Sequence, residues 1–241
     1  MIKEEIKIFD DSEALYKGFS EFLIKLLDVY PQINLSLSGG NTPKGLFEYW
    51  SKNHKEDIAW ERIMFFWGDE RCVPPKDEMS NFGMTKDFLF NNIDKIESKG
   101  WRRIHGENSP EEEAEWYSRI LTTKVKQRKD VPTFEIMMLG LGDDGHTVSI
   151  FPEQMELWDS DKLCVVAEHP ESKMQRVSIT GQVVNNSQYV VFLVTGKNKA
   201  EKVRDIIKHR DQFVDKYPAA KVDPKKGYLY WFMDKEAASL L

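Results

Sequence analysis

Apolar residues along the chain follow two periods, one typical of helices and one typical of strands. Residues 11–30 carry apolar side chains at three- and four-residue steps, and Pro31 follows them, so this stretch predicts an amphipathic helix. Residues 33–38 (I-N-L-S-L-S) instead alternate apolar and polar positions, which is the period of a half-buried strand. Short apolar or alternating runs predict further strands at 63–67, 134–139, 163–167, 176–180, 189–195 and 228–233.

Helical stretches separate most of these strands. Thr42 and Pro43 suit the cap and the first position of a helix. Ser109 to Glu112 has the sequence of a capping box and opens a helix that ends near Gln127. Further helices are expected at 80–91, near 181, from 196 to about 209 and, capped by Asp234, at the C-terminus. Alternation without a linker or a repeat predicts a single α/β domain over residues 1–241, with a mostly parallel sheet and helices on both faces.

Composition narrows the possible partners. The chain of 241 residues has a formal net charge of −6, which argues against bulk attraction to nucleic acid or to an anionic membrane. No apolar run approaches the roughly 20 residues that span a bilayer. The N-terminus lacks the apolar region of a secretory signal, so a cytoplasmic protein is expected. The sequence leaves open whether it is a monomer or a small homo-oligomer.

No metal or other cofactor is expected. Two cysteines, Cys72 and Cys164, do not make a disulfide framework, and the five histidines lack the paired spacing of zinc ligands. Residues 140–145 (G-L-G-D-D-G) have the form of a dinucleotide fingerprint. They lie in mid-chain, however, and no clear acidic residue follows about 20 positions on, so nicotinamide dinucleotide binding is not predicted.

Leu139 to Phe151 (L-G-L-G-D-D-G-H-T-V-S-I-F) is the most informative stretch. The predicted strand 134–139 leads into a glycine-rich turn, where glycine lets other groups approach the backbone closely. The turn carries Asp144 and His146, with one glycine between them. Open α/β sheets bind ligands at such strand ends, so a site is expected here.

Other predicted strands also end in polar, glycine-rich segments. Ser38 to Thr42 (S-G-G-N-T) leads into a helix whose first N–H groups can bind an anion. Asp69 to Arg71 follows the strand 63–67, and Gly196 to Lys199 follows the strand 189–195. Because the carboxyl ends of parallel strands share one edge, these segments are expected to converge, with Arg176 joining from a fifth strand.

Three of these segments resemble one enzyme family. Leu139 to Pro152 is similar to the 6-phosphogluconolactonase signature L-G-x-G-x-D-G-H-T-A-S-L-F-P, with Asp143 and Val148 where other residues are more usual. Residues 38–43 (S-G-G-N-T-P) resemble the S-G-G-x-T-P of sugar-phosphate lactonases and deaminases. Residues 68–74 (G-D-E-R-C-V-P), followed by Ser-Asn, fit the lactonase pattern. The resemblance implies a Rossmann-like three-layer α/β/α sandwich.

The same resemblance implies hydrolysis of 6-phospho-D-glucono-1,5-lactone, a small phosphosugar lactone, in the oxidative pentose phosphate pathway. On this hypothesis His146 is the general base that activates water, and Asp144 orients the imidazole or the water. Arg71, or backbone N–H groups of the glycine turn, stabilises the oxyanion. The expected substrate-binding residues are Ser38, Gly39, Gly40, Thr42, Asp69, Gly142, Arg176 and Lys199, with the phosphate against Gly39, Gly40 and Thr42 and with Lys199 and Arg176 as its counter-charges.

Two alternatives stay open. Glucosamine-6-phosphate deaminases share the S-G-G-x-T-P and D-G-H patterns, but they continue as I-A-F-N-E-P with a ring-opening Glu. Phe151 takes the place of that Glu here, and Arg71 replaces the Tyr of a D-E-Y sequence. A non-catalytic sugar-phosphate sensor would tend to lose catalytic side chains, whereas this chain retains Asp144, His146 and Arg71. Both differences favour the lactonase.

Overall fold

The computed structural model describes residues 3–241 and is built on a six-stranded parallel sheet. Across the sheet the strands run in the order β1 (Lys3–Phe9), β11 (Tyr228–Asp234), β10 (Tyr189–Val194), β7 (Ile136–Leu139), β2 (Ile33–Leu37) and β3 (Ile63–Trp67). Residues of the inner strands are almost completely buried, as expected for a parallel sheet covered on both faces. The mostly parallel α/β prediction is confirmed.

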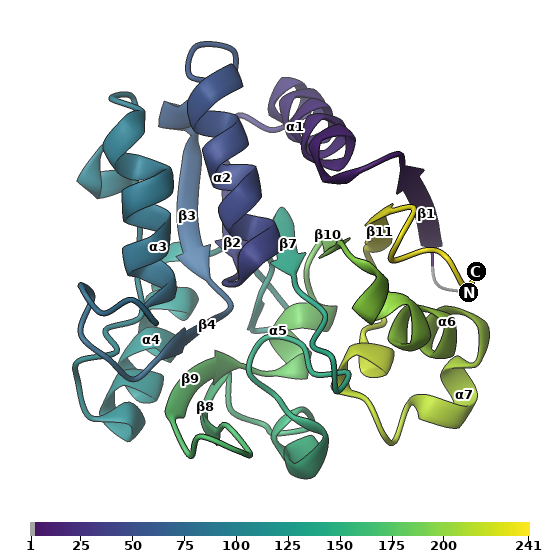
Figure 1. Cartoon of the computed structure of the whole chain (residues 1–241). Coiled ribbons are helices and arrows are strands. Elements are labelled where there is room, and N and C mark those ends of the chain that lie inside the picture. Colours follow the sequence, from purple (N-terminus) through teal and green to yellow (C-terminus); the bar gives the residue numbers. More distant parts are fainter. Residues whose placement is uncertain (1–2) are drawn as a thin grey trace.

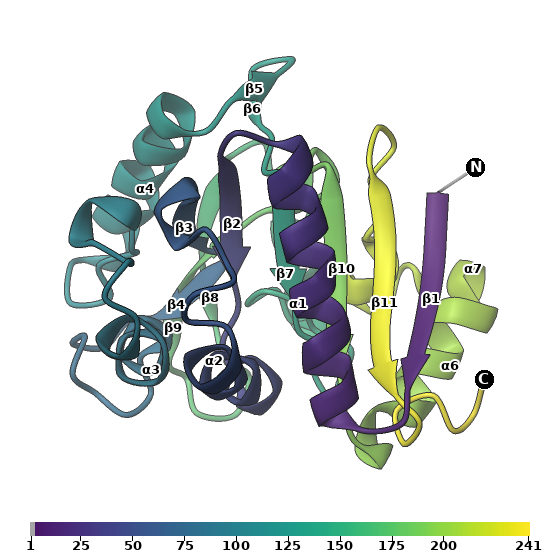
Figure 2. The ribbon, with the colours of Figure 1, turned by 90° about the horizontal axis from the view of Figure 1, so that it is seen from above.

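Helices cover both faces of the sheet. They are α1 (Ser12–Val29), α2 (Asn41–Asn53), α3 (Asn81–Phe88), α4 (Pro110–Lys124), α5 (Gly181–Asn185), α6 (Ala200–Lys208) and α7 (Arg210–Phe213). Figure 1 shows α1 and α2 above the sheet and α5, α6 and α7 below it. Figure 2, viewed from above, shows α1 running in nearly the same direction as the strands, on one face of the sheet, where its buried Leu15, Phe19 and Leu23 face the core. No helix in the described part of the chain has the length and apolar character needed to cross a membrane.

The chain connections diverge on either side of β2 and β7. From β2 the chain passes through α2 to β3 at one edge of the sheet. From β7 it passes through α5 to β10, which lies on the other side. Such a reversal leaves a crevice at the carboxyl ends of the two central strands, which is the usual ligand site of an open α/β sheet.

A second sheet corrects one expectation. β4 (Asp69–Arg71), β9 (Gln175–Ile179) and β8 (Cys164–Glu168) pair antiparallel, in the order β4-β9-β8, apart from the main sheet. The predicted strands 163–167 and 176–180 therefore exist, but they do not extend the parallel sheet. Arg176 consequently lies near the start of an antiparallel strand, opposite Arg71, rather than at the carboxyl end of a parallel one.

Several element ends also differ from the sequence predictions. The edge strand β1 was not predicted, and neither was the short hairpin of β5 (Gln127–Arg128) and β6 (Val131–Pro132). The predicted C-terminal helix is only a series of turns. The prediction of a capping box at residues 109–112 is wrong, because the side chain of Ser109 makes no capping hydrogen bond. Helix α4 ends at Lys124, before the predicted end near Gln127. Helix α1, by contrast, is capped by Asp11, whose side chain accepts from the backbone N–H of Ala14.

Tyr117 fixes the carboxyl end of β3, the strand that leads into Asp69–Arg71. As an edge strand, β3 has backbone groups that no neighbouring strand pairs. From α4, the fully buried Tyr117 hydroxyl donates to the carbonyl of Trp67 and accepts from its N–H, both at 2.9 Å. One hydroxyl thus satisfies both backbone groups of the last residue of the strand.

We expect the Tyr117→Phe substitution to lower the free energy of unfolding by about 1–3 kcal/mol, because it leaves two buried backbone groups of Trp67 without a partner. Urea denaturation monitored by tryptophan fluorescence measures the loss. Tyr49→Phe, which removes the hydroxyl of a partly exposed tyrosine, is the matched control. Equal losses in the two variants would contradict this role of Tyr117.

Candidate active site

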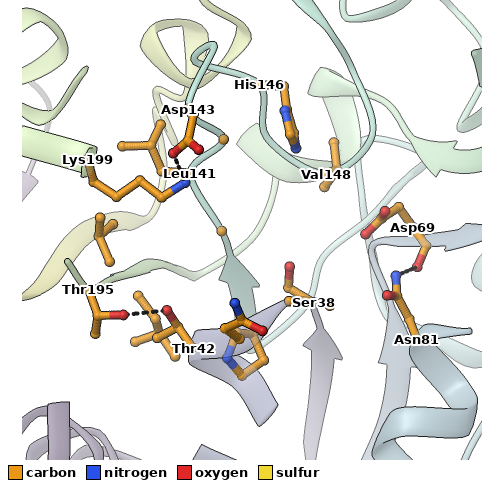
Figure 3. A pocket seen from close by; sticks show the side chains of 18 of the residues that line it. Ser38, Thr42, Asp69, Asn81, Leu141, Asp143, His146, Val148, Thr195 and Lys199 are labelled. Atoms are coloured by element: carbon orange, nitrogen blue, oxygen red, sulfur yellow. Dashed lines mark hydrogen bonds and ion pairs between the residues drawn. The ribbon is translucent and has the colours of Figure 1, made fainter. Parts of the chain in front are cut away.

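A cavity of about 460 Å³ opens at the carboxyl ends of the central strands (Figure 3). Its size falls in the range of small-molecule sites. Every site residue predicted from the sequence except Asp144 lines it. The lining consists of Ser38–Pro43, Asp69, Arg71, Asn81, Gly140–Asp143, His146, Val148, Arg176, Leu193–Thr195, Asn198 and Lys199. The expected convergence of strand ends is therefore present.

Asp144 contacts the cavity through His146. Its Oδ1 lies 2.7 Å from Nδ1 of His146 and also accepts the backbone N–H of His146 at 3.0 Å. Because an ionised carboxylate can only accept, Nδ1 carries the hydrogen, and in the neutral imidazole Nε2 then holds the lone pair. Such an imidazole can take a proton from a ligand or a water at Nε2.

Gly142 is required for this geometry. A Cβ atom at this position would lie 2.2 Å from Nδ1 of His146 and 2.5 Å from Oδ1 of Asp144. The turn is closed by the Gly142 N–H, which donates to the His146 carbonyl at 2.9 Å, and by Thr147 Oγ1, which donates to the Gly140 carbonyl at 2.9 Å. The glycine pattern seen in the sequence thus makes room for the Asp–His pair.

The contact between Asp144 and His146 determines the direction in which the pKa of Asp144 is shifted. Partial burial works to raise the pKa of Asp144, but the hydrogen bond and the charge of His146 outweigh it and lower the pKa to about 2. Asp144 is therefore an anion throughout the neutral range, able to stabilise an imidazolium if His146 accepts a proton.

Arg71 and Arg176 form a cationic side of the cavity. They are directly opposite each other in the β4–β9 pair, where like charges repel unless something compensates them. Arg176 Nη1 donates to Ser149 Oγ at 3.3 Å, and Ser149 Oγ donates in turn to Asp69 Oδ2 at 2.5 Å. Burial lowers the pKa of Arg176, and the nearby charge of Asp69 opposes that shift. Within residues 3–241, the buried Nε of each arginine has no hydrogen-bond partner, so both retain donor capacity.

Glu70 lies between Asp69 and Arg71 in β4. Because side chains alternate along a strand, Glu70 points away from the cavity that Asp69 and Arg71 line. It is buried and accepts from the backbone N–H groups of Asn81 and Phe82, which begin α3, and from that of Arg71. Burial raises the pKa of Glu70 to about 7, although these hydrogen bonds act to lower it. Its contacts join α3 to β4 and so position Asn81 at the cavity.

Helix α2 presents its N-terminus to the opposite part of the cavity. Its cap residue is Gly40, at φ +100°, a conformation that favours glycine. The prediction that Thr42 caps the helix is wrong, because Thr42 Oγ1 instead pairs with Thr195 Oγ1 at 2.7 Å (Figure 3). That hydrogen bond links the first turn of α2 to the residue that follows β10. The first N–H groups of α2 have no partner within the helix and can bind an anion.

Lys199 approaches the same part of the cavity from the turn after β10. The N–H of Gly196 donates to both carboxylate oxygens of Asp234, at 3.0 and 3.1 Å, which fixes the start of this turn. Figure 3 shows Lys199 next to Asp143 on one side of the cavity and Asp69 with Asn81 on the other. Because Arg176 is linked to Asp69 through Ser149, the cavity has a cationic group on each of these two sides.

Asn81 belongs to the sequence pattern of the resemblance, but no role was predicted for it, and three further polar residues of the site were missed. Asn81 is buried at the cavity wall, and its Nδ2 donates to the Asp69 carbonyl at 3.0 Å. Thr195 and Asn198 line the cavity and lie within four residues of Lys199, at the end of the same strand and in the same turn. Their proximity to Lys199 in the sequence could have indicated that they belong to the site. Ser149 lies two residues after the D-G-H-T sequence, but nothing local indicates that it bridges Asp69 and Arg176. No cluster of metal-ligating side chains occurs among residues 3–241.

Fold and cavity together define a class, namely Rossmann-like α/β proteins with an Asp–His pair and anion-binding groups at the topological switch point. The chain belongs to the family of glucosamine-6-phosphate isomerases and 6-phosphogluconolactonases, whose family model matches residues 10–231. It is 39% identical to a 6-phosphogluconolactonase of Treponema pallidum, over 83% of this chain and 82% of that protein. It is 38% identical to one of Haemophilus influenzae, over 95% of each. The structure of a Thermotoga maritima 6-phosphogluconolactonase superposes with a TM-score of 0.83 at 30% identity, covering 97% of this chain and 100% of that one.

We expect Asp144→Asn to lower the melting temperature by an amount that depends on pH. The folded-state pKa of about 2 lies below the ordinary 3.8, so ionised Asp144 stabilises the fold above about pH 4, and this contribution is lost as the pH falls towards 2. Thermal unfolding of wild type and variant from about pH 5 downwards measures the difference, which should shrink. A difference that stays constant down to the lowest pH at which both fold would refute the pairing.

Proposed function

We propose that this chain is a 6-phosphogluconolactonase, a hydrolase that opens 6-phospho-D-glucono-1,5-lactone to 6-phospho-D-gluconate in the oxidative pentose phosphate pathway. The relatives of 38% and 39% identity over most of the chain carry that name. The observation that carries the proposal is the Asp144–His146 contact of 2.7 Å, which leaves Nε2 of an imidazole at the cavity wall able to accept a proton.

His146 acts in this mechanism first as a base and then as an acid. Nε2 takes a proton from water while the water oxygen attacks the lactone carbonyl carbon. Asp144, hydrogen-bonded to Nδ1, stabilises the imidazolium that forms. The tetrahedral intermediate then collapses, the bond between the carbonyl carbon and the ring oxygen breaks, and the imidazolium returns the proton to that oxygen. The acid product loses its proton to solvent.

Other groups of the cavity stabilise the oxyanion and bind the phosphate and the sugar ring. Arg71, or the N–H groups of the glycine turn, stabilises the oxyanion, because donors fixed before the reaction cost no reorganisation. The phosphate lies against Gly39, Gly40 and Thr42, with Lys199 and Arg176 as counter-charges. Ser38, Asp69 and Gly142 line the space between, where the sugar ring binds.

Phe151 argues against the deaminase alternative. It occupies the position of the ring-opening Glu in the deaminase sequence pattern, and it is fully buried with its ring centroid 4.7 Å from that of His146. A phenyl ring there can support the imidazole but cannot transfer a proton. A sensor that only binds would need neither the Asp144–His146 pair nor the close approach that Gly142 permits.

The direct test is hydrolysis of freshly generated 6-phosphogluconolactone, followed by proton release and corrected for spontaneous opening of the ring. We expect enzyme-dependent lactone loss in proportion to protein concentration. The same preparation is incubated with glucosamine-6-phosphate and assayed for ammonia. Ammonia release without lactone hydrolysis would assign the deaminase, and binding of 6-phosphogluconate without either reaction would assign the sensor.

His146→Ala should lower the catalysed rate of lactone hydrolysis by about 10²–10⁴-fold, because it removes the general base. His169→Ala is the matched control, since its ring packs on the same Phe151, with centroids 5.2 Å apart, and should change the rate by less than about threefold. A loss below about threefold in His146→Ala would exclude His146 as the base.

A further inference from the structure

Asp143 directly precedes Asp144, but its side chain lies on the Lys199 side of the cavity (Figure 3). Its Oδ1 accepts from Asn198 Nδ2 at 2.8 Å and from Lys199 Nζ at 2.5 Å. Asp143 is 70% exposed, whereas Lys199 is 20% exposed. A single exposed carboxylate oxygen therefore binds both polar side chains that the turn after β10 brings to the cavity.

Resting on the function proposed above, we propose that Asp143 is a residue of the binding site that weakens phosphate binding by competing for Lys199. A phosphate bound to Lys199 has to share the ammonium group with this carboxylate or displace it. Both groups are anionic, so they also repel each other across the short distance that a shared ammonium allows. The large exposed fraction of Asp143 leaves it room to turn into solvent when it is displaced.

The energies involved make such an exchange feasible. Ion pairs with an exposed partner contribute little to stability, so a phosphate that makes charge-assisted hydrogen bonds to Lys199 and to the N-terminus of α2 can displace Asp143. The competition nevertheless reduces the net affinity. Asp143 thereby limits how tightly the cavity retains a phosphorylated product, without any contact to the Asp144–His146 pair through its own side chain.

Asp143→Asn is expected to tighten the binding of 6-phosphogluconate about threefold to tenfold. Isothermal titration calorimetry at low ionic strength measures this, with inorganic phosphate as a second probe. The gain should shrink as salt is raised towards about 1 M, where the Debye length is about 3 Å. A purely structural role of Asp143 would not give this salt dependence.

The chain offers a closely matched control. Asp159 pairs with Lys221 at 2.5 Å, with side chains 64% and 18% exposed, and neither residue lines the cavity. Asp159→Asn removes an equivalent ion pair and should leave the affinity for 6-phosphogluconate unchanged. An equal gain in both variants would mean that only the net charge of the protein matters, and the inference would be wrong.

Lys199→Met separates failure of the inference from failure of the proposed function. If Asp143 acts through Lys199, the gain from Asp143→Asn disappears in the Asp143→Asn, Lys199→Met double variant. Unchanged or weaker binding in Asp143→Asn, with Lys199→Met still weakening it, overturns the inference alone. If Lys199→Met leaves 6-phosphogluconate binding unchanged, the phosphate placement in the proposed function is wrong, and the inference fails with it.

Discussion

The direction in which the chain leaves β2 and β7 is the constraint on which the rest of the structure depends. These strands are neighbours, but one connection runs towards β3 and the other towards β10. Within residues 3–241 no crossover helix therefore covers the point between their carboxyl ends, and the glycine-rich segments that follow them face each other across an open cavity. Position in the sheet, rather than proximity in sequence, brings Gly40 and His146 to one site.

Two of the three cationic side chains that line this cavity are linked to a carboxylate. Arg176 is linked through Ser149 to Asp69, and Lys199 is paired with Asp143. Each of these two cations therefore has a nearby anion that offsets part of the cost of removing it from water. The two sides differ in how firmly the partner is fixed, because Asp69 is 4% exposed and the side chain of Asp143 is 70% exposed. Only the second partner is free to yield to a ligand.

Structural features that depend on the local sequence were predictable, whereas features that depend on contacts between distant residues were not. The inner strands and the glycine turns after them follow from apolar runs and from residues such as Gly142. Strand β1 escaped prediction because it is an exposed edge strand whose sequence, K-E-E-I-K-I-F, is mostly polar. The pairing of β9 with β4 and the hydrogen bond between Thr42 and Thr195 join residues about a hundred or more positions apart, and no periodicity specifies such partners.

Val148 shows how these distant contacts act on the backbone. This β-branched residue has φ +48°, a strained conformation for its type, and it lines the cavity. Its neighbours are fixed in different directions, because Thr147 donates to the Gly140 carbonyl in the same turn while Ser149 donates to Asp69 and receives a hydrogen bond from Arg176. Both sets of contacts can form only if the chain between them turns sharply. The strain at Val148 therefore results from joining the Asp–His turn to the arginine side of the cavity, and the hydrogen bonds on either side maintain it.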